Sequence, residues 1–284
     1  MAKLYAGLAG LKLAGDAFDL GDGIRIEGAF GHLMLPFVMA FKPAPLGKPH
    51  PGPWRAVRGS SGMDMTATLL VPDKIGDASE WEVARTIVFL LRLGVDPATT
   101  VPVLSSHPFA ELATLPEHET KISVLETRAR AFALIVDQAA LGEPQAAWLR
   151  ERWRKTLELL RSSAEFELAV AAMDAGQFER NTALTMVALW SALEAIFAGD
   201  RNELKFRLST YIASYLEAHG PERAKLQKAI AKLYDKRSAA VHGLPKHSAD
   251  DVLEVFSLMR AVLMKIIDAG RVPTRLDLET ALFG

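Results

Sequence analysis

The sequence has no cysteine among its 284 residues. This absence excludes disulfide scaffolds, thiolate zinc sites and cysteine nucleophiles. Long hydrophobic runs are also missing, because the best ones, 87–91 and 131–136, fall far short of the ~18 apolar residues that span a bilayer. No charge sign dominates, since 33 Lys and Arg nearly balance 34 Asp and Glu. Early glycines interrupt any signal-peptide pattern. We therefore expect a globular, cytoplasmic protein with no membrane segment.

Glycine and proline are concentrated in the first 114 residues or so, most densely at 42–53, where they predict a loop or a polyproline-like connector. Short apolar or alternating stretches predict strands at 23–28, 34–41 and 63–71. Residues 81–93 carry apolar side chains at helical spacing, and Ser79 precedes them as a candidate N-cap. The first part of the chain is therefore expected to be an α+β domain.

Helical periodicity dominates from about residue 117 onward. The expected helices cover 119–141, 149–160, 166–173, 182–198, 204–218, 222–242 and 248–270, with glycine at their ends. The break at Gly142-Glu-Pro144 is interpreted as a domain boundary. We therefore expect an α+β domain of unknown role at 1–142 and an all-α helical bundle at 143–284.

The expected helix 182–198 contains one charged residue, Glu194, in an otherwise apolar segment. A helix that is apolar all round is expected to be central and buried. An unpaired buried carboxylate costs several kcal/mol, so Glu194 needs a cation from elsewhere in the fold. Arg237 lies about 20° from Leu226, within the apolar stripe of the helix 222–242. Its fork of donors suits a carboxylate or a phosphate, and we predict that Glu194 and Arg237 meet.

His242 follows Arg237 by five residues, about 140° further round the helix. The reach of the arginine, or fraying at Gly243, would have to bring the two side chains into one pocket. The helix dipole favours the imidazolium and the arginine opposes it, so His242 could act as acid or base near neutral pH. Two alternatives stay open: the Glu–Arg pair is only a structural bridge, and His242 only caps the helix. The other histidines show no metal-ligand spacing, and no metal or other cofactor is expected.

The segment 233–243, Leu-Tyr-Asp-Lys-Arg-Ser-Ala-Ala-Val-His-Gly, resembles the signature of HEPN domains. Together with the preceding Ala192-Leu193-Glu194 it resembles the Apea-like branch, in which serine after the arginine is usual. The resemblance covers 150–268. It implies a small α-helical bundle that forms a homodimer, with the arginine–histidine motifs of both chains facing one cleft. Many HEPN domains are metal-independent endoribonucleases in defence or toxin systems; others are inactive binding modules.

Carried onto this sequence, the resemblance implies that Arg237 and His242 are catalytic and that Glu194, Ser238 and Tyr234 support them. The local surplus of cations predicts RNA contacts by Lys228, Lys232, Lys236 and Lys246, although a solvated lysine face explains it equally well. The expected partners are RNA and a second copy of the chain. The alternative function is a non-catalytic HEPN module for dimerisation or for binding a partner or nucleotide. A third alternative is an enzyme whose chemistry lies in the first half of the chain. No motif supports it, because neither a Gly-x-Ser-x-Gly turn nor a phosphate-binding glycine loop occurs there.

Overall fold

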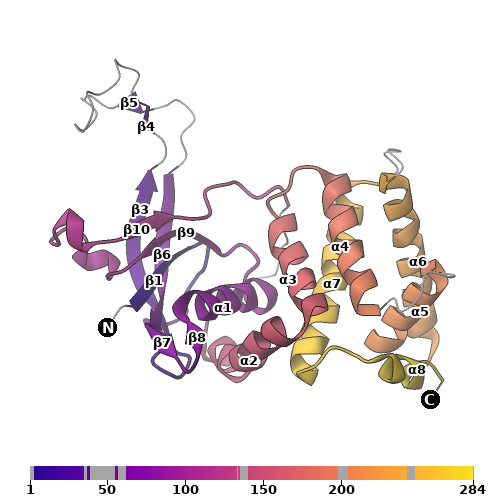
Figure 1. Cartoon of the computed structure of the whole chain (residues 1–284). Coiled ribbons are helices and arrows are strands. Elements are labelled where there is room, and N and C mark those ends of the chain that lie inside the picture. The colour runs from indigo at the N-terminus through magenta and orange to yellow at the C-terminus, as the bar shows by residue number, and fades with distance from the viewer. Residues whose placement is uncertain are drawn as a thin grey trace.

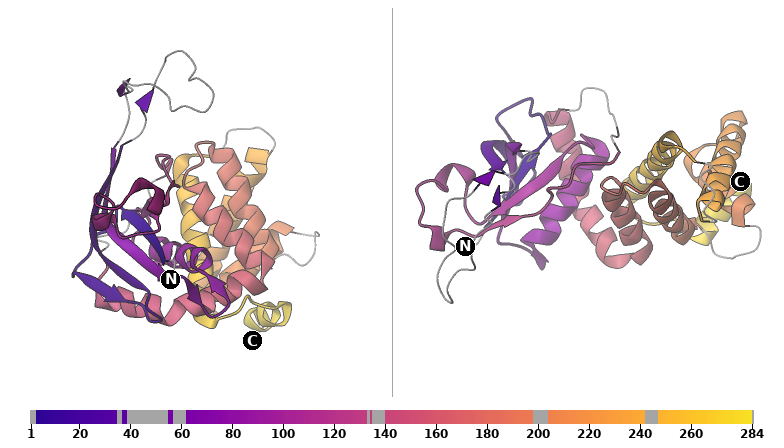
Figure 2. Two further views of the ribbon diagram at one scale, coloured as in Figure 1. Left: turned by 60° about the vertical axis from the view of Figure 1, so that its left-hand side comes forward. Right: turned by 90° about the horizontal axis from the view of Figure 1, so that it is seen from above.

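The computed structural model describes residues 3–34, 37–38, 55–56, 62–132, 134, 140–197, 204–241 and 247–283. A β-sheet region lies at one end of the molecule and a helical region at the other, with α1 and α2 between them (Figure 1). The view from above separates the sheet and the helices in the same way (Figure 2). The coarse expectation of an α+β region followed by helices is confirmed. The proline-rich segment 42–53 lies outside the described residues.

Six antiparallel strands form the main sheet, in the order β10-β9-β1-β6-β3-β2. Their bounds are β1 Lys3–Ala9, β2 Ala17–Asp19, β3 Arg25–Met34, β6 Gly62–Pro72, β9 Thr100–Ser105 and β10 Ile122–Val124. Two small pairs are β4 Phe37–Val38 with β5 Arg55–Ala56, and β7 Lys74–Ile75 with β8 Ala78–Ser79. The expected strands at 23–28 and 63–71 are confirmed, and the one at 34–41 is described only at Met34 and β4.

Strand β1 was not predicted, although it lies in the middle of the sheet. Its sequence is broken by Gly7, a residue that weakens a strand pattern. The structure supplies the reason for this glycine: a Cβ at Gly7 would overlap the Sδ of Met65 and touch the ring of Phe109. Phe109 begins the short 3-10 helix η1 (Phe109–Glu111), which packs on this face of the sheet.

The expected helix at 119–141 is wrong over the described residues 119–132, and residues 133 and 135–139 lie outside the described residues. Residues 117–119 form a 3-10 turn (η2), Ile122–Val124 is strand β10, and the backbone from 125 to 132 is not helical. Ile122 and Val124 are β-branched residues that favour a strand, and β10 pairs with β9 at the edge of the sheet. The backbone N–H groups of Leu125 and Glu126 then donate to Pro102 and Val101, which holds the chain against β9 beyond the strand. Pairing with a distant strand overrode the local helical pattern.

The helices are α1 Glu80–Gly94, α2 Glu143–Ser162, α3 Ala164–Gly176, α4 Thr182–Phe197, α5 Leu204–Leu216, α6 Pro221–Val241, α7 Ala249–Ala269 and α8 Arg275–Phe283. The first seven overlap the remaining expected helices, although α2 begins six residues before its expected start, and α8 was not predicted. Ser248 caps α7 in a capping box with Asp251, and Gly270 ends it in the left-handed conformation at φ 68°. No helix in the described ranges has both the length and the apolar content to cross a bilayer.

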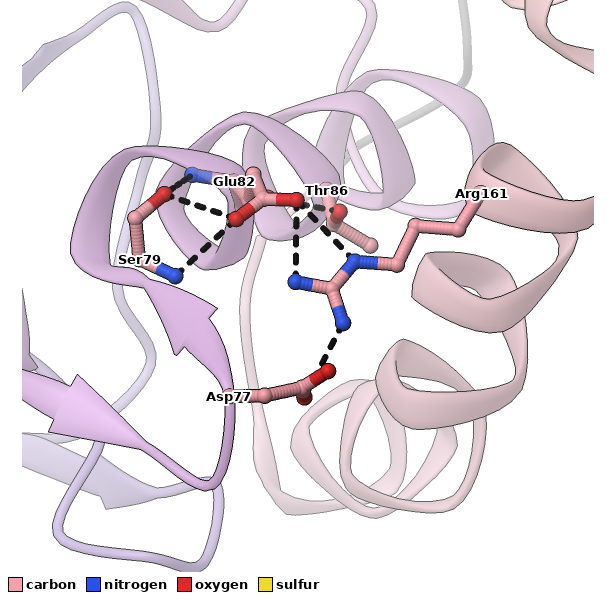
Figure 3. Close-up of polar contacts among 5 residues, drawn as sticks. All are labelled: Asp77, Ser79, Glu82, Thr86 and Arg161. Atoms are coloured by element: carbon pink, nitrogen blue, oxygen red, sulfur yellow. Dashed lines mark hydrogen bonds and ion pairs between the residues drawn. The ribbon is translucent and has the colours of Figure 1, made fainter.

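Helix α1 begins with the predicted cap. The Ser79 hydroxyl accepts from the backbone N–H of Glu82 at 3.3 Å, and the Glu82 carboxylate accepts from the backbone N–H of Ser79 at 3.0 Å (Figure 3). Arg161, near the end of α2, reaches Glu82 at 2.9 Å and Asp77 at 3.0 Å. Figure 3 shows its guanidinium between the two carboxylates. The start of α1 is thereby connected to the end of α2.

One continuous group of buried side chains extends from the sheet through α1 and α2 into the helical region. Trp153 of α2 is almost fully buried, and its indole N–H donates to the carbonyl of Leu20, just after β2, at 3.2 Å. The expected boundary at Gly142 falls where sheet gives way to helix, immediately before α2. The division into domains at 1–142 and 143–284 stays a prediction.

Helix α4 is not buried on all sides, contrary to expectation. Its Leu184 is 58% exposed, and Ala188 and Ala195 are exposed as well. Helices α3, α6 and α7 pack against the other faces. A uniformly apolar sequence does not reveal which face has a neighbour, and small alanines leave little apolar surface in water.

Candidate functional site

Glu194 of α4 and Arg237 of α6 form an ion pair, as predicted. A single nitrogen of the guanidinium makes the contact: Nη2 lies 3.2 Å from Oε1 and 3.3 Å from Oε2 of Glu194. The arginine therefore does not present its fork to the carboxylate in the bidentate manner. The pair lies between two packed helices, and each side chain retains about a fifth of its surface, 22% for Arg237 and 20% for Glu194. Solvent or a ligand can therefore reach it.

Tyr234 is the third member of this site. Its hydroxyl donates to Oε1 of Glu194 at 3.0 Å, and its ring lies under the guanidinium of Arg237 at 5.5 Å. Trp190 of α4 meets the same ring edge-on, with 5.1 Å between the ring centroids. Burial, the charge of Glu194 and the hydrogen bond to it raise the pKa of Tyr234 to about 12. Tyr234 is therefore a neutral donor at physiological pH, and it helps to orient the carboxylate.

Arg237 keeps donors that Glu194 does not use. Its Nε is buried and has no hydrogen-bond partner among the described residues, and the hydrogen bond to Glu194 uses Nη2 alone. A buried donor without a partner costs about 1–3 kcal/mol. The Nη1–H groups, which Glu194 does not use, are the donors with which Arg237 can bind a second anion such as a phosphate.

His242 and Lys246 lie outside the described residues, because the description of α6 ends at Val241. The approach of the imidazole to Arg237 therefore stays a prediction. Ser238 lies on α6 beside Arg237 and is partly exposed. It is available to a ligand bound next to the arginine.

The expected lysine contacts do not converge on Arg237. Lys228 and Lys232 are exposed, but on α6 they lie about 180° and 140° away from position 237. Lys236 forms an ion pair with Asp251 of α7 at 3.2 Å. Among the described residues, Arg237 is thus the cation that this site offers to a ligand.

A second ionic cluster escaped the sequence analysis. Arg92 of α1 is 5% exposed and binds two carboxylates: Nη2 lies 2.5 Å from Glu126, after β10, and Nη1 lies 3.3 Å from Asp174 of α3. Its Nε donates to the carbonyl of Thr99 at 3.0 Å. The Glu126 carboxylate also accepts from the backbone N–H of Val101 at 2.7 Å. This Arg92 cluster connects α1, α3 and the segments around β9 and β10.

A signal for the Arg92 cluster was present in the sequence. Arg92 interrupts the apolar run 87–93, just as Glu194 interrupts its own helix. Arg130 lies close by and donates to Thr99 at 2.6 Å; burial and the charge of Arg92 lower its pKa to about 10. Two arginines gathered in a largely apolar region are costly to bury unless carboxylates accompany them.

No group of His, Asp or Glu side chains within the described ranges is arranged to hold a metal ion. Comparison of the chain with family models, with curated proteins and with solved structures finds no match.

Proposed function

We propose that this protein is a metal-independent endoribonuclease of the HEPN type, acting in the cytoplasm, whose helical region is a HEPN-like bundle. The observation that supports the proposal is the state of Arg237. Glu194 and Tyr234 hold this arginine from one side, while its Nε has no partner among the described residues. An arginine that is fixed but not saturated is suited to bind a phosphate group.

The reaction needs no metal ion. A base removes the proton of a ribose 2′-hydroxyl, the 2′-oxygen attacks the adjacent phosphorus, and the bond to the 5′-oxygen breaks as that oxygen takes up a proton. The products are a 2′,3′-cyclic phosphate and a 5′-hydroxyl. In this proposal His242 transfers the protons and Arg237 stabilises the charge on the phosphate oxygens. DNA lacks the 2′-hydroxyl and is not cut.

Glu194 and Tyr234 are positioning residues in this proposal. The carboxylate fixes one nitrogen of Arg237, and the tyrosine hydroxyl fixes the carboxylate. Ser238 adjoins the phosphate on the same helix. The resemblance to HEPN domains supports a homodimer with the cleft at its interface and a role in a defence or toxin-like system.

The experiment incubates the full chain with single-stranded RNA in the presence of EDTA. Arg237→Gln and His242→Asn are expected to lower the cleavage rate at least ~100-fold. The first removes electrostatic stabilisation of the transition state and the second removes general acid–base catalysis, and each contributes about that factor. Lys155→Gln, a change of charge at an exposed position of α2, is the matched control and should stay near the wild-type rate. Cleavage that survives both of the first two substitutions would refute the assignment.

The second candidate function is a non-catalytic HEPN module that dimerises or binds a partner or nucleotide. One observation favours it: Glu194 already balances the charge of Arg237, and Asp251 balances that of Lys236. RNA or a nucleotide would then bind and stay intact, with affinity lost in Arg237→Gln but kept in His242→Asn. Light scattering across a concentration series tests the dimer, and a fully active monomer would contradict the shared cleft.

A further inference from the structure

An open groove of about 590 Å³ lies between α5 and α6. Its lining residues are Leu204, Lys205, Phe206 and Ser209 of α5 and Gln227 and Ala231 of α6, and we call it the Phe206 groove. The side chain of Gln227 crosses it, because its Nε2 donates to the hydroxyl of Ser209 at 2.9 Å. Gln227 and Ala231 lie about 80° and 120° round the helix from Arg237. The groove and the candidate site therefore lie on two different sides of α6.

The groove combines an exposed aromatic ring with an amide. Phe206 is 63% exposed. Single exposed apolar side chains are common on protein surfaces, but this ring stands beside polar groups that have hydrogen-bonding capacity left. The amide of Gln227 uses one N–H for Ser209, and its carbonyl oxygen and second N–H make no hydrogen bond to another described residue. A nucleobase has the matching features, a flat π face and an edge of donors and acceptors.

The cations around the Phe206 groove are only partly compensated. Lys205 forms an ion pair with Asp235 at 2.6 Å. Lys228 and Lys232 are exposed and lie about 60° and 100° round α6 from Ala231. Neither forms an ion pair in the part of the chain that the structure describes. Three lysines thus accompany one carboxylate, and the remaining positive charge suits the phosphates of a nucleic acid.

We propose that the Phe206 groove binds single-stranded RNA. One base stacks on Phe206 and forms a hydrogen bond with Gln227, and Lys228 and Lys232 contact the phosphates on either side of that base. Pairing in a duplex would hide both the face and the edge of the base, so the groove favours single strands. This inference rests on the proposed ribonuclease function, because it assigns a binding surface for the same substrate. A strand held here lies against the helix that carries Arg237.

The test measures binding of a single-stranded 2′-O-methyl oligonucleotide to the full chain by fluorescence anisotropy, with a length of about twelve nucleotides, as single-strand-binding folds contact. The 2′-O-methyl groups prevent cleavage, so binding is measured separately from activity. Phe206→Ala is expected to weaken binding at least about fivefold, because stacking of one base contributes that factor or more. Phe30→Ala, the same change at a ring on β3 that is 74% exposed, is the matched control and should bind like wild type.

A second probe separates stacking from charge. The same oligonucleotide with abasic residues keeps its phosphates, so Phe206→Ala should leave its affinity unchanged. Lys228→Gln combined with Lys232→Gln should weaken both probes and lower the slope of log affinity against log salt concentration by about 0.7 for each lysine. Lys155→Gln, at an exposed position of α2, should leave that slope intact.

Three results would overturn the proposal: no weakening of the base-containing probe by Phe206→Ala, equal weakening of both probes, or dissociation of a dimer by Phe206→Ala in light scattering. In the last case a second copy of the chain, and not a base, covers the ring. Binding that depends on Phe206 in a chain that cuts no RNA would refute only the nuclease. Cleavage that depends on Arg237, with binding that is insensitive to Phe206, would refute only this inference.

Discussion

Arg92 and Arg237 each interrupt an apolar face of a helix, and each is paired with a carboxylate, yet the structure uses them differently. All three nitrogens of Arg92 contact an acceptor, and the side chain is 5% exposed. Arg237 is 22% exposed and binds Glu194 through one nitrogen, while its Nε finds no hydrogen-bond partner in the part of the chain that the structure describes. A saturated arginine can only hold the fold together. An arginine with unused donors can also bind a ligand.

The two clusters also differ in what they connect. Arg92 brings together α1, α3 and the segments around β9 and β10, which are far apart in the sequence. Glu194 and Arg237 connect the neighbouring helices α4 and α6, whose contact is made by apolar side chains as well. Loss of Arg92 should therefore affect stability, and loss of Arg237 should affect function more than stability.

The largest effect is expected for Arg92→Met. The substitution leaves Glu126 and Asp174 without their cation, and breaking a buried pair from one side costs about 3–5 kcal/mol. We expect the lower end of this range, because each carboxylate keeps about a fifth of its surface, 22% and 23%. Urea unfolding gives the free energy, and Arg128→Met is the exposed control, expected within about 0.5 kcal/mol of wild type. A loss of unfolding free energy as small as that of Arg128→Met would show that Arg92 does not stabilise the fold.

Adding Asp174→Asn to Arg92→Met should restore about 1–3 kcal/mol of the loss. The second substitution removes a buried carboxylate that has lost its partner, and an unpaired buried charge is the main cost. A double-mutant cycle in urea measures the coupling. If the losses of unfolding free energy from the two single substitutions simply add, the contact between Arg92 Nη1 and Asp174 Oδ1 at 3.3 Å contributes nothing to stability.

At the other cluster, Glu194→Gln should lower the pKa of Tyr234 from about 12 toward its usual value near 10, because the neighbouring charge is removed. A raised tyrosine pKa favours the neutral form in the folded state, so stability is lost as the pH rises from about 10 through 12. NMR titration of labelled tyrosine measures the pKa, and Tyr234→Phe identifies the signal. That variant should cost about 1 kcal/mol for the lost hydrogen bond.

The smallest effect is expected at Arg161, which also contacts two carboxylates but is largely exposed (Figure 3). Its hydrogen bond is the main cause that lowers the pKa of Asp77. Arg161→Gln should raise that pKa toward its usual value and leave the unfolding midpoint close to wild type, most of all in high salt. If Arg161→Gln shifted the unfolding midpoint as much as Arg92→Met does, burial of the arginine would not determine how much its ion pairs contribute to stability.

Features that depend only on the sequence of one helix could be predicted. Ser79 with Glu82 is a capping box that four residues encode, and the position of Arg237 on its apolar stripe follows from helical spacing alone. The contact with Glu194 then followed because a lone acid on an apolar helix needs a cation. Features that depend on distant strands were missed or wrong, as at β1, whose glycine is explained only by Met65, and at 119–141, where pairing with β9 decided the structure.

The sequence by itself determined the order of sheet and helices, most helix boundaries and the pairing of Glu194 with Arg237, because each rests on local periodicity and on the cost of a buried charge. Only the tertiary structure decided that one nitrogen of Arg237 suffices for Glu194. It also decided that Arg92 gathers two acids from separate segments beside a pocket. Which donors are used and which are left over depends on the angles at which packed elements meet, and those angles are not encoded in any one segment.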